Sequence, residues 1–208
     1  EANNQYTSNN PLEPENDDTA AIDDHTIVKL GVDVRIRFGQ QYLNYPDEKF
    51  NIPSELYPTL YLGYEKGFGS SSITNHYDQF KIRLTQSFDI ANKGEFAYNL
   101  RAGAFLNSDA ISFVDYQHFN GNQSYVTRKD YMESFFLLPY YSFSTNKEYI
   151  EGHAEHNFNG FIMNRIPLLK NLNAHLIVSG KFLATSNNRP YSEFGVALGN
   201  LGFKKFKF

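Results

Sequence analysis

One short segment, His153-Ala154-Glu155-His156, brings two imidazoles and a carboxylate together within four residues. These are ligand types that zinc uses in proteins. The surrounding pattern predicts a strand near 149–158, and successive side chains of a strand point to opposite faces. His153 and Glu155 would then share one face, with His156 on the other. We therefore expect a polar pair instead of a metal site, unless a bulge separates the two histidines.

Nucleophilic catalysis is the second chemistry that these residue types allow. If the predicted strands form a β-barrel, a hydrolase could be built into its wall. It would need Ser, His and an acid to converge. Serines and six histidines are present, but no spacing singles out a triad. The absence of cysteine removes a thiol nucleophile, a disulfide framework and any Cys-ligated metal. We predict no catalytic, cofactor-binding or metal site and no cofactor, with a barrel-wall hydrolase as an alternative.

Charged side chains recur at alternate positions of the predicted strands. On one strand face, they would neutralise one another across neighbouring strands. The alternative is an electrostatic lining that selects solutes, and both can hold. The predicted lumen-facing charges are Lys29, Asp33, Arg35, Arg37, Lys81, Arg83 and Arg101.

The strand that would carry four of these charges is the clearest element of the sequence. From Val28 to Phe38, apolar residues alternate strictly with charged residues and glycine over eleven positions. A strand that crosses a bilayer needs roughly 9–11 residues, whereas soluble strands usually have about 5–6. The pattern favours a membrane strand over the rival architecture, a soluble β-sandwich. The predicted lipid-facing residues are Val28, Leu30, Val32, Val34, Ile36, Phe80, Ile82 and Leu84.

Similar alternation recurs along the chain. It predicts further strands near 59–65, 80–90, 96–106, 149–158, 174–185 and 191–199, seven in all. Ala91-Asn92-Lys93-Gly94 would join two of them in a hairpin. Seven strands cannot close a single-chain bacterial barrel, and open edges in lipid would leave backbone groups unsatisfied. We therefore expect the remaining strands to lie outside this sequence.

Composition agrees with this architecture. The mean hydropathy is −0.51, and no apolar run approaches the roughly 20 residues of a membrane helix. The chain has 19 Phe and 15 Tyr but no Trp, so Phe and Tyr would form the interfacial girdles. A net charge of −4 without a basic block argues against a nucleic-acid partner. Residues 1–26 read as an extracellular loop or disordered lead-in, and 27–208 as the partial barrel.

The longest connection, 107–134, is polar and contains a distinctive run. Its amide side chains can satisfy backbone groups, and its glycine permits a turn. We interpret the connection as a loop that folds into the lumen as a plug, with pore gating as the functional alternative. The run is His118, Phe119, Asn120, Gly121, Asn122 and Gln123.

A set of ordered landmarks resembles a known family over nearly the whole chain. They are Tyr6-Thr7-Ser8-Asn9-Asn10-Pro11, Arg37-Phe38-Gly39-Gln40-Gln41-Tyr42, Tyr57-Pro58-Thr59-Leu60, His118 to Gln123, Leu138-Pro139-Tyr140-Tyr141, Phe143-Ser144-Thr145-Asn146, Glu155-His156-Asn157-Phe158-Asn159-Gly160 and Ile166-Pro167-Leu168-Leu169. The chain resembles the C-terminal barrel of Bacteroidota-type outer-membrane proteins with a carboxypeptidase-regulatory-like N-terminal domain, which is more distantly similar to BamA-like assembly barrels.

The resemblance implies an all-β, antiparallel transmembrane barrel of about sixteen strands, of which this chain supplies about seven. It also implies a location in the bacterial outer membrane. The partners would be membrane lipid, the remainder of the same barrel and other envelope proteins. The segment Arg101 to Gln123 occupies the place of an inward-folding loop, but it lacks the Val-Arg-Gly-aromatic motif of the assembly barrels. We therefore expect a structural, transport or assembly component of an envelope complex, and alternatively a porin-like passive channel restricted by the loop.

Overall fold

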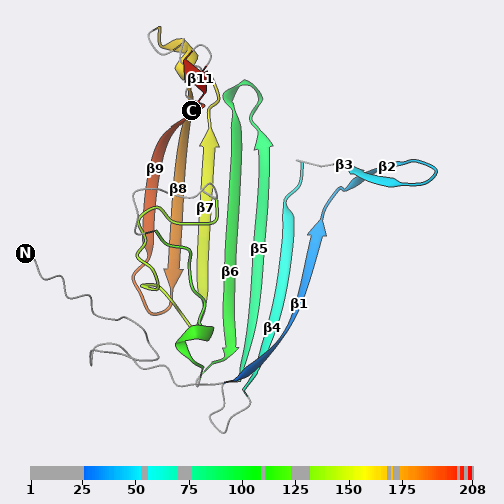
Figure 1. Ribbon diagram of the computed structural model, residues 1–208, viewed down its shortest axis with the longest axis vertical. Coiled ribbons are helices and arrows are strands. Elements are labelled where there is room, and N and C mark those ends of the chain that lie inside the picture. The colour runs from blue at the N-terminus through cyan, green and yellow to red at the C-terminus, as the bar shows by residue number, and fades with distance from the viewer. Residues whose placement is uncertain are drawn as a thin grey trace, which may run out of the picture.

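Seven long strands form one antiparallel sheet in the computed structural model, in the order β1-β4-β5-β6-β7-β8-β9 (Figure 1). The model describes residues 26–52, 56–69, 76–108, 111–122, 132–167, 170, 174–200, 202–203 and 206–207. The strands are β1 Ile27–Arg37, β4 Thr59–Gly69, β5 Tyr77–Asp89, β6 Glu95–Asn107, β7 Tyr149–Asn157, β8 His175–Thr185 and β9 Tyr191–Gly199. They correspond one to one with the seven predicted strands, so the all-β antiparallel prediction is confirmed.

The smaller elements were not predicted, except for the one that forms the predicted turn from Ala91 to Gly94. They are the hairpin strands β2 Gln41–Asn44 and β3 Lys49–Ile52, the two-residue strands β10 Gly202–Phe203 and β11 Phe206–Lys207, and the 3-10 turns η1 Ala91–Lys93, η2 Phe113–Asp115 and η3 Met163–Arg165. Strands of four residues hold too few positions for period two to stand out. In the part of the chain that the structure describes, no helix is long and apolar enough to cross a membrane.

The register of the sheet keeps one face apolar from edge to edge. Val34 of β1 lies opposite Leu62, which lies opposite Ile82 and then Ala102 and Ile150. Six of the eight predicted lipid-facing residues are exposed, from 38% at Ile82 to 63% at Val28. The other two, Ile36 and Leu84, are half-buried. Phe194, Val196 and Leu198 continue the exposed apolar face on β9.

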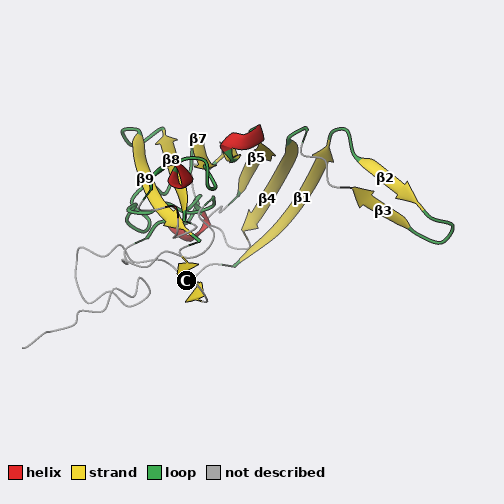
Figure 2. Ribbon diagram, turned by 90° about the horizontal axis from the view of Figure 1, so that it is seen from above, coloured by secondary structure: helices red, strands yellow, loops and turns green. Residues whose placement is uncertain are grey.

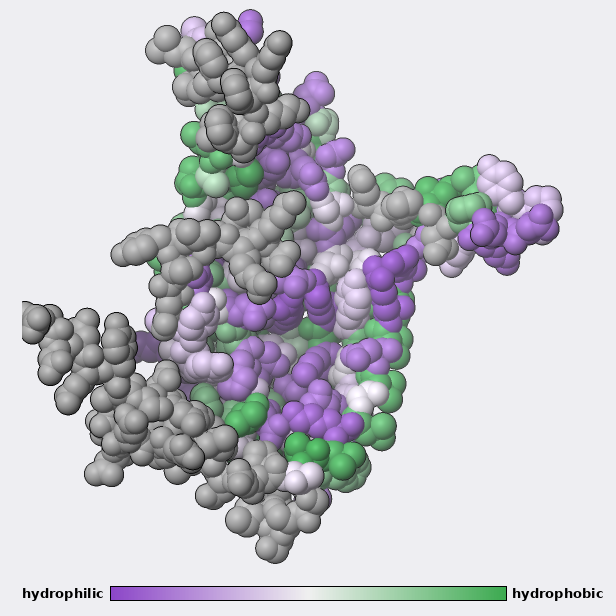
Figure 3. Space-filling model, viewed as in Figure 1, coloured by the Kyte–Doolittle hydropathy of each residue, from purple (hydrophilic) through white to green (hydrophobic). Residues whose placement is uncertain are grey.

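The opposite face is polar, and the buried core of the described chain lies against it. Figure 3 shows hydrophilic residues over the middle of the sheet on this side. The core cluster consists of Phe119, Phe135 and Leu138 from the β6–β7 connection, with Tyr149 and Leu183 from the sheet. A soluble sandwich would instead pack its apolar face on a second sheet. Among the described residues, the only other sheets are two short hairpins.

The sheet is curved but does not close on itself. Figure 2 shows the strands along an arc, with the β6–β7 connection inside it. Within the described ranges, β1 and β9 are edge strands, because neither is paired on its outer side. The end of the sheet that carries the β5–β6 turn also carries the β2–β3 hairpin, and we call it the short-turn end. We call the other the long-loop end.

Gly94 closes the β5–β6 turn in a conformation that only glycine adopts readily. Its φ is 106°, and an added Cβ would overlap the backbone carbonyl of Asn157. We predict that Gly94→Ala lowers the free energy of unfolding by about 2–4 kcal/mol, measured by urea unfolding in detergent. Gly31→Ala is the control, because a Cβ there would come no closer than 3.9 Å to Tyr64 O. Equal effects of the two variants would contradict this prediction.

Candidate functional site

The connection between β6 and β7 folds back along the polar face of the sheet and forms the candidate site. One of its contacts with the sheet is a hydrogen bond of 2.7 Å from Asn99 Nδ2 to Met132 O. Asn99 lies eight residues along β6 from its end at Asn107, about 26 Å at 3.3 Å per residue. The connection therefore crosses most of the height of the sheet.

The two described arms of the connection, 111–122 and 132–148, hold each other through their backbones. Gln117 and Thr145 form an isolated antiparallel bridge. Phe135 N–H donates to Asn120 O at 2.8 Å, and Asn122 N–H donates to Leu138 O at 2.9 Å. These hydrogen bonds satisfy backbone N–H and C=O groups that an irregular loop would otherwise leave unpaired. The connection is thus an ordered insert.

Carboxylates of the β6–β7 connection neutralise several of the strand charges that the sequence predicted to face the lumen. Arg83 Nη2 lies 2.6 Å from Glu133 Oε1, and Arg101 Nη2 lies 3.3 Å from the same oxygen. Lys29 Nζ lies 2.7 Å from Asp115 Oδ1. Two of the predicted charges also follow the strand-to-strand scheme. Lys81 Nζ lies 3.5 Å from Glu65 Oε2, and Arg101 Nη1 lies 3.7 Å from Glu151 Oε2.

The remaining predicted charges lie on the uncovered side of the polar face. Asp33, Arg35 and Arg37 are exposed on β1. The Arg35 guanidinium lies over the Tyr61 ring at 5.2 Å. The loop therefore covers the polar face over the middle of the sheet and towards β9. On β1 it reaches Lys29 and leaves the stretch from Asp33 to Arg37 exposed.

Glu193 on β9 anchors the loop to the wall. Its carboxylate accepts the backbone N–H groups of Phe136 and Leu137, the latter at 3.0 Å, and the Tyr191 hydroxyl at 2.9 Å. Lys181 donates to the backbone carbonyl of Ser134, and its Nζ lies 3.5 Å from the centre of the Phe136 ring. Glu193 and Lys181 are both buried. Bonds to an ionised acceptor in a buried site are the stronger kind, so this contact fixes the loop position.

His153 lies behind this loop segment, fully buried. Its Nε2 is 2.7 Å from Glu151 Oε1, and its Nδ1 has no hydrogen-bond partner in the described chain. Its ring packs against the Phe135 ring at a tilt of 52°, with 4.8 Å between the ring centres. His156 lies on the other face, against Phe96 and Phe158. The two imidazoles thus diverge, as the strand geometry predicts.

The described residues contain no group of three or more acidic or histidine side chains placed to hold a metal ion. They also show no serine hydroxyl hydrogen-bonded to His153.

The predicted loop motif divides between core and surface. Phe119 is in the core cluster, and Asn120 Nδ2 donates to Glu133 O at 2.9 Å. Gly121 contacts the backbone of Leu138, where a Cβ would overlap the carbonyl oxygen. Gln123 lies outside the described residues. His118 belongs to an aromatic group with Phe113 and Tyr141, at 5.2 and 5.1 Å between ring centres.

The wall anchors and the loop acids were not chosen from the sequence. Glu151, Lys181 and Glu193 all lie at inward positions of alternating strands, so the period-two pattern could have identified them. Asp115 and Glu133 lie in irregular backbone, where no period assigns a side chain to a face. Their pairing with Lys29 and Arg83 is visible only in the folded chain.

We predict that Glu193→Gln loosens the loop. A neutral amide accepts weaker hydrogen bonds than a carboxylate, so the opening free energy at the amides of Phe136 and Leu137 should fall by about 1–2 kcal/mol. Hydrogen exchange at these amides measures the change. Glu148→Gln in the same connection is the control, because Glu148 is exposed. Unchanged protection in the Glu193 variant would show that the carboxylate does not anchor the loop.

Burial lowers the pKa of His118 below its ordinary value of 6.5, although the backbone carbonyls of Val114 and Phe113 and the Asp115 carboxylate oppose this. The folded loop thus favours the neutral imidazole, whose Nδ1 lies 2.7 Å from Ser144 Oγ. The stabilisation is present above pH 6.5 and is lost as the pH falls through the lowered pKa.

We therefore predict that acidification below 6.5 increases opening of the segment around Ser144. Hydrogen exchange, corrected for the pH dependence of intrinsic exchange, measures this opening. His118→Phe keeps the ring packing without a titrating group and should remove the pH dependence. A pH dependence that persists in this variant would assign the effect to another group.

Comparison with known proteins identifies a family but no individual relative. No curated protein and no solved structure matches the chain. The model of the C-terminal domain of a family of unknown function, DUF5686, matches residues 1–198. That match covers nearly all of the 208 residues, and the chain therefore belongs to the DUF5686 C-terminal domain family.

Proposed function

We propose that this chain is a wall segment of a bacterial outer-membrane β-barrel whose lumen is plugged by its own β6–β7 connection. The proposal rests on the arrangement of the two faces of the sheet, which is the reverse of that in a soluble protein. The apolar face is exposed, and the polar face lies against the buried core. Water would disfavour such a continuous apolar surface, whereas lipid would bury it. The long strands, of 9 to 13 residues, support the same environment.

The two edges of the sheet extend the proposal. Unpaired strand edges in lipid would leave backbone hydrogen-bonding groups unsatisfied. Further strands of the same protein would pair with β1 and β9 and close the barrel, in keeping with the resemblance to larger, BamA-like barrels. The partners of this segment are then outer-membrane lipid, the rest of the barrel and other proteins of an envelope complex.

A plugged barrel fits a structural, transport or assembly role better than steady diffusion. The carboxylates of Asp115 and Glu133 neutralise Lys29, Arg83 and Arg101, so these cations are not left to line a water-filled path. A hollow of about 290 Å³ remains near Thr59, Thr85 and Asn99, beside Met132. That hollow favours the second candidate, a porin-like channel restricted by the loop.

Planar-bilayer conductance of the full-length protein tests the plug. We expect insertion without a large, steady open state. The double change Glu133→Gln and Glu193→Gln should raise the conductance or the frequency of openings, because it removes carboxylate contacts on the two flanks of the inserted segment. Glu148→Gln is the control. A large, steady open state of the unaltered protein would contradict the plug and favour the passive channel.

A further inference from the structure

The β2–β3 hairpin leaves the sheet sideways and belongs to no part of the candidate site. Figures 1 and 2 both show it projecting past β1, away from β4 and the other strands. Gly39, with φ 63°, starts this change of direction, and the Tyr57 ring lies where a Cβ would stand. Gln40 Nε2 donates to Ile52 O at 2.8 Å and ties the base of the hairpin.

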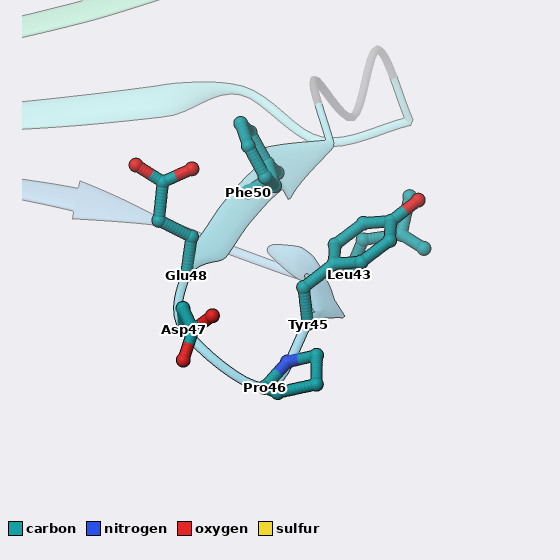
Figure 4. Close-up of a pocket in the computed structure, with 6 residues that line it drawn as sticks. All are labelled: Leu43, Tyr45, Pro46, Asp47, Glu48 and Phe50. Carbon is teal, nitrogen blue, oxygen red and sulfur yellow. The ribbon is translucent and has the colours of Figure 1, made fainter.

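One face of the hairpin is apolar. Leu43 lies opposite Phe50 in the register, and the Tyr45 ring meets the Phe50 ring edge to face at 5.7 Å. About half of each of these three side chains is exposed. They line an open hollow with the turn residues Pro46, Asp47 and Glu48 (Figure 4). The opposed pair Asn44 and Lys49 lies on the other face.

A two-stranded hairpin is marginally stable at best in water without a cover for its apolar face. Among the described residues, the ring contacts and the hollow of this face involve only the hairpin itself. Whatever covers the apolar face of the hairpin must therefore lie outside this sheet, near the point where the hairpin leaves it.

The same end of the sheet carries the aromatic end of the apolar face. The hairpin leaves from the short-turn end, where Phe88 and Phe96 pack at 5.7 Å and Tyr98 follows at 6.4 Å from Phe96 on the apolar face. Rings at the end of an apolar band mark the membrane–water interface in outer-membrane barrels. The hairpin extends outward beyond β1 from this end of the sheet (Figure 1).

We propose that the β2–β3 hairpin is an interfacial anchor that lies in the bilayer surface beside the barrel. This inference rests on the proposed membrane location of the sheet. Leu43, Tyr45 and Phe50 enter the boundary between headgroups and acyl chains, as amphipathic segments do. The polar turn and the Asn44–Lys49 face remain in water. Tyrosine suits this position because its ring is apolar and its hydroxyl is polar.

Site-specific fluorescence in the full-length protein tests the anchor. The 208 residues contain no cysteine, so Phe50→Cys introduces one labelling site in this part of the protein for an environment-sensitive dye. Any cysteine elsewhere in the full-length protein is replaced by serine. In phosphatidylcholine vesicles brominated near the headgroup end of the acyl chains, we expect roughly twofold or stronger quenching. Aqueous iodide should have little effect. Leu43→Cys gives a second reading with the Tyr45–Phe50 pair intact.

Two matched positions separate the outcomes. Asn44→Cys, on the polar face of the hairpin, should respond to iodide and not to bromine. Val32→Cys reports whether the apolar face of the sheet lies in lipid. Quenching by bromine at Val32 together with iodide access at Phe50 would overturn the anchor alone. Shielding of Phe50 from both quenchers would also overturn it, by assigning a protein neighbour. No bromine quenching at Val32 would overturn the proposed function itself.

Discussion

The alternation of side chains along an extended backbone is the constraint on which the structure depends. Each strand has two faces, and the antiparallel register carries Val34, Leu62 and Ile82 to the same one. A shift by a single residue would move every apolar side chain to the polar face. The seven strands keep this register except at one end of the β5–β6 pair, where it shifts between Asp78 and Gln79. The sheet therefore separates an apolar surface from a polar surface over its whole width.

The β6–β7 connection pairs with the charged and polar side chains of the polar surface. Buried charged and polar groups are costly unless they are paired. Glu133 lies between Arg83 and Arg101, and Glu193 accepts two backbone N–H groups of the loop. The aromatic residues of the loop then pack above these contacts on Tyr149 and Leu183. Sheet and loop form one folding unit, in which the loop takes the place of a second layer.

The buried groups of this site hold the loop and the strands in position. His153 is held by Glu151 on one side and Phe135 on the other. Lys181 reaches a backbone carbonyl of the loop and a ring face. Breaking a buried pair is more costly than the pair is favourable. Such a network resists displacement of the loop, which is the property that a plug requires and that an open channel would not.

The sequence by itself determined the seven strands and the two faces, because a period of two over 9 to 13 residues is a local property of the chain. It also placed His153 and His156 on opposite faces. The β2–β3 hairpin was missed, because four-residue strands carry little period. Only the tertiary structure decided that Asp115 and Glu133 neutralise the wall charges and that Glu193 holds the loop. These contacts join residues 50 or more positions apart, and irregular backbone gives no rule for where such side chains point.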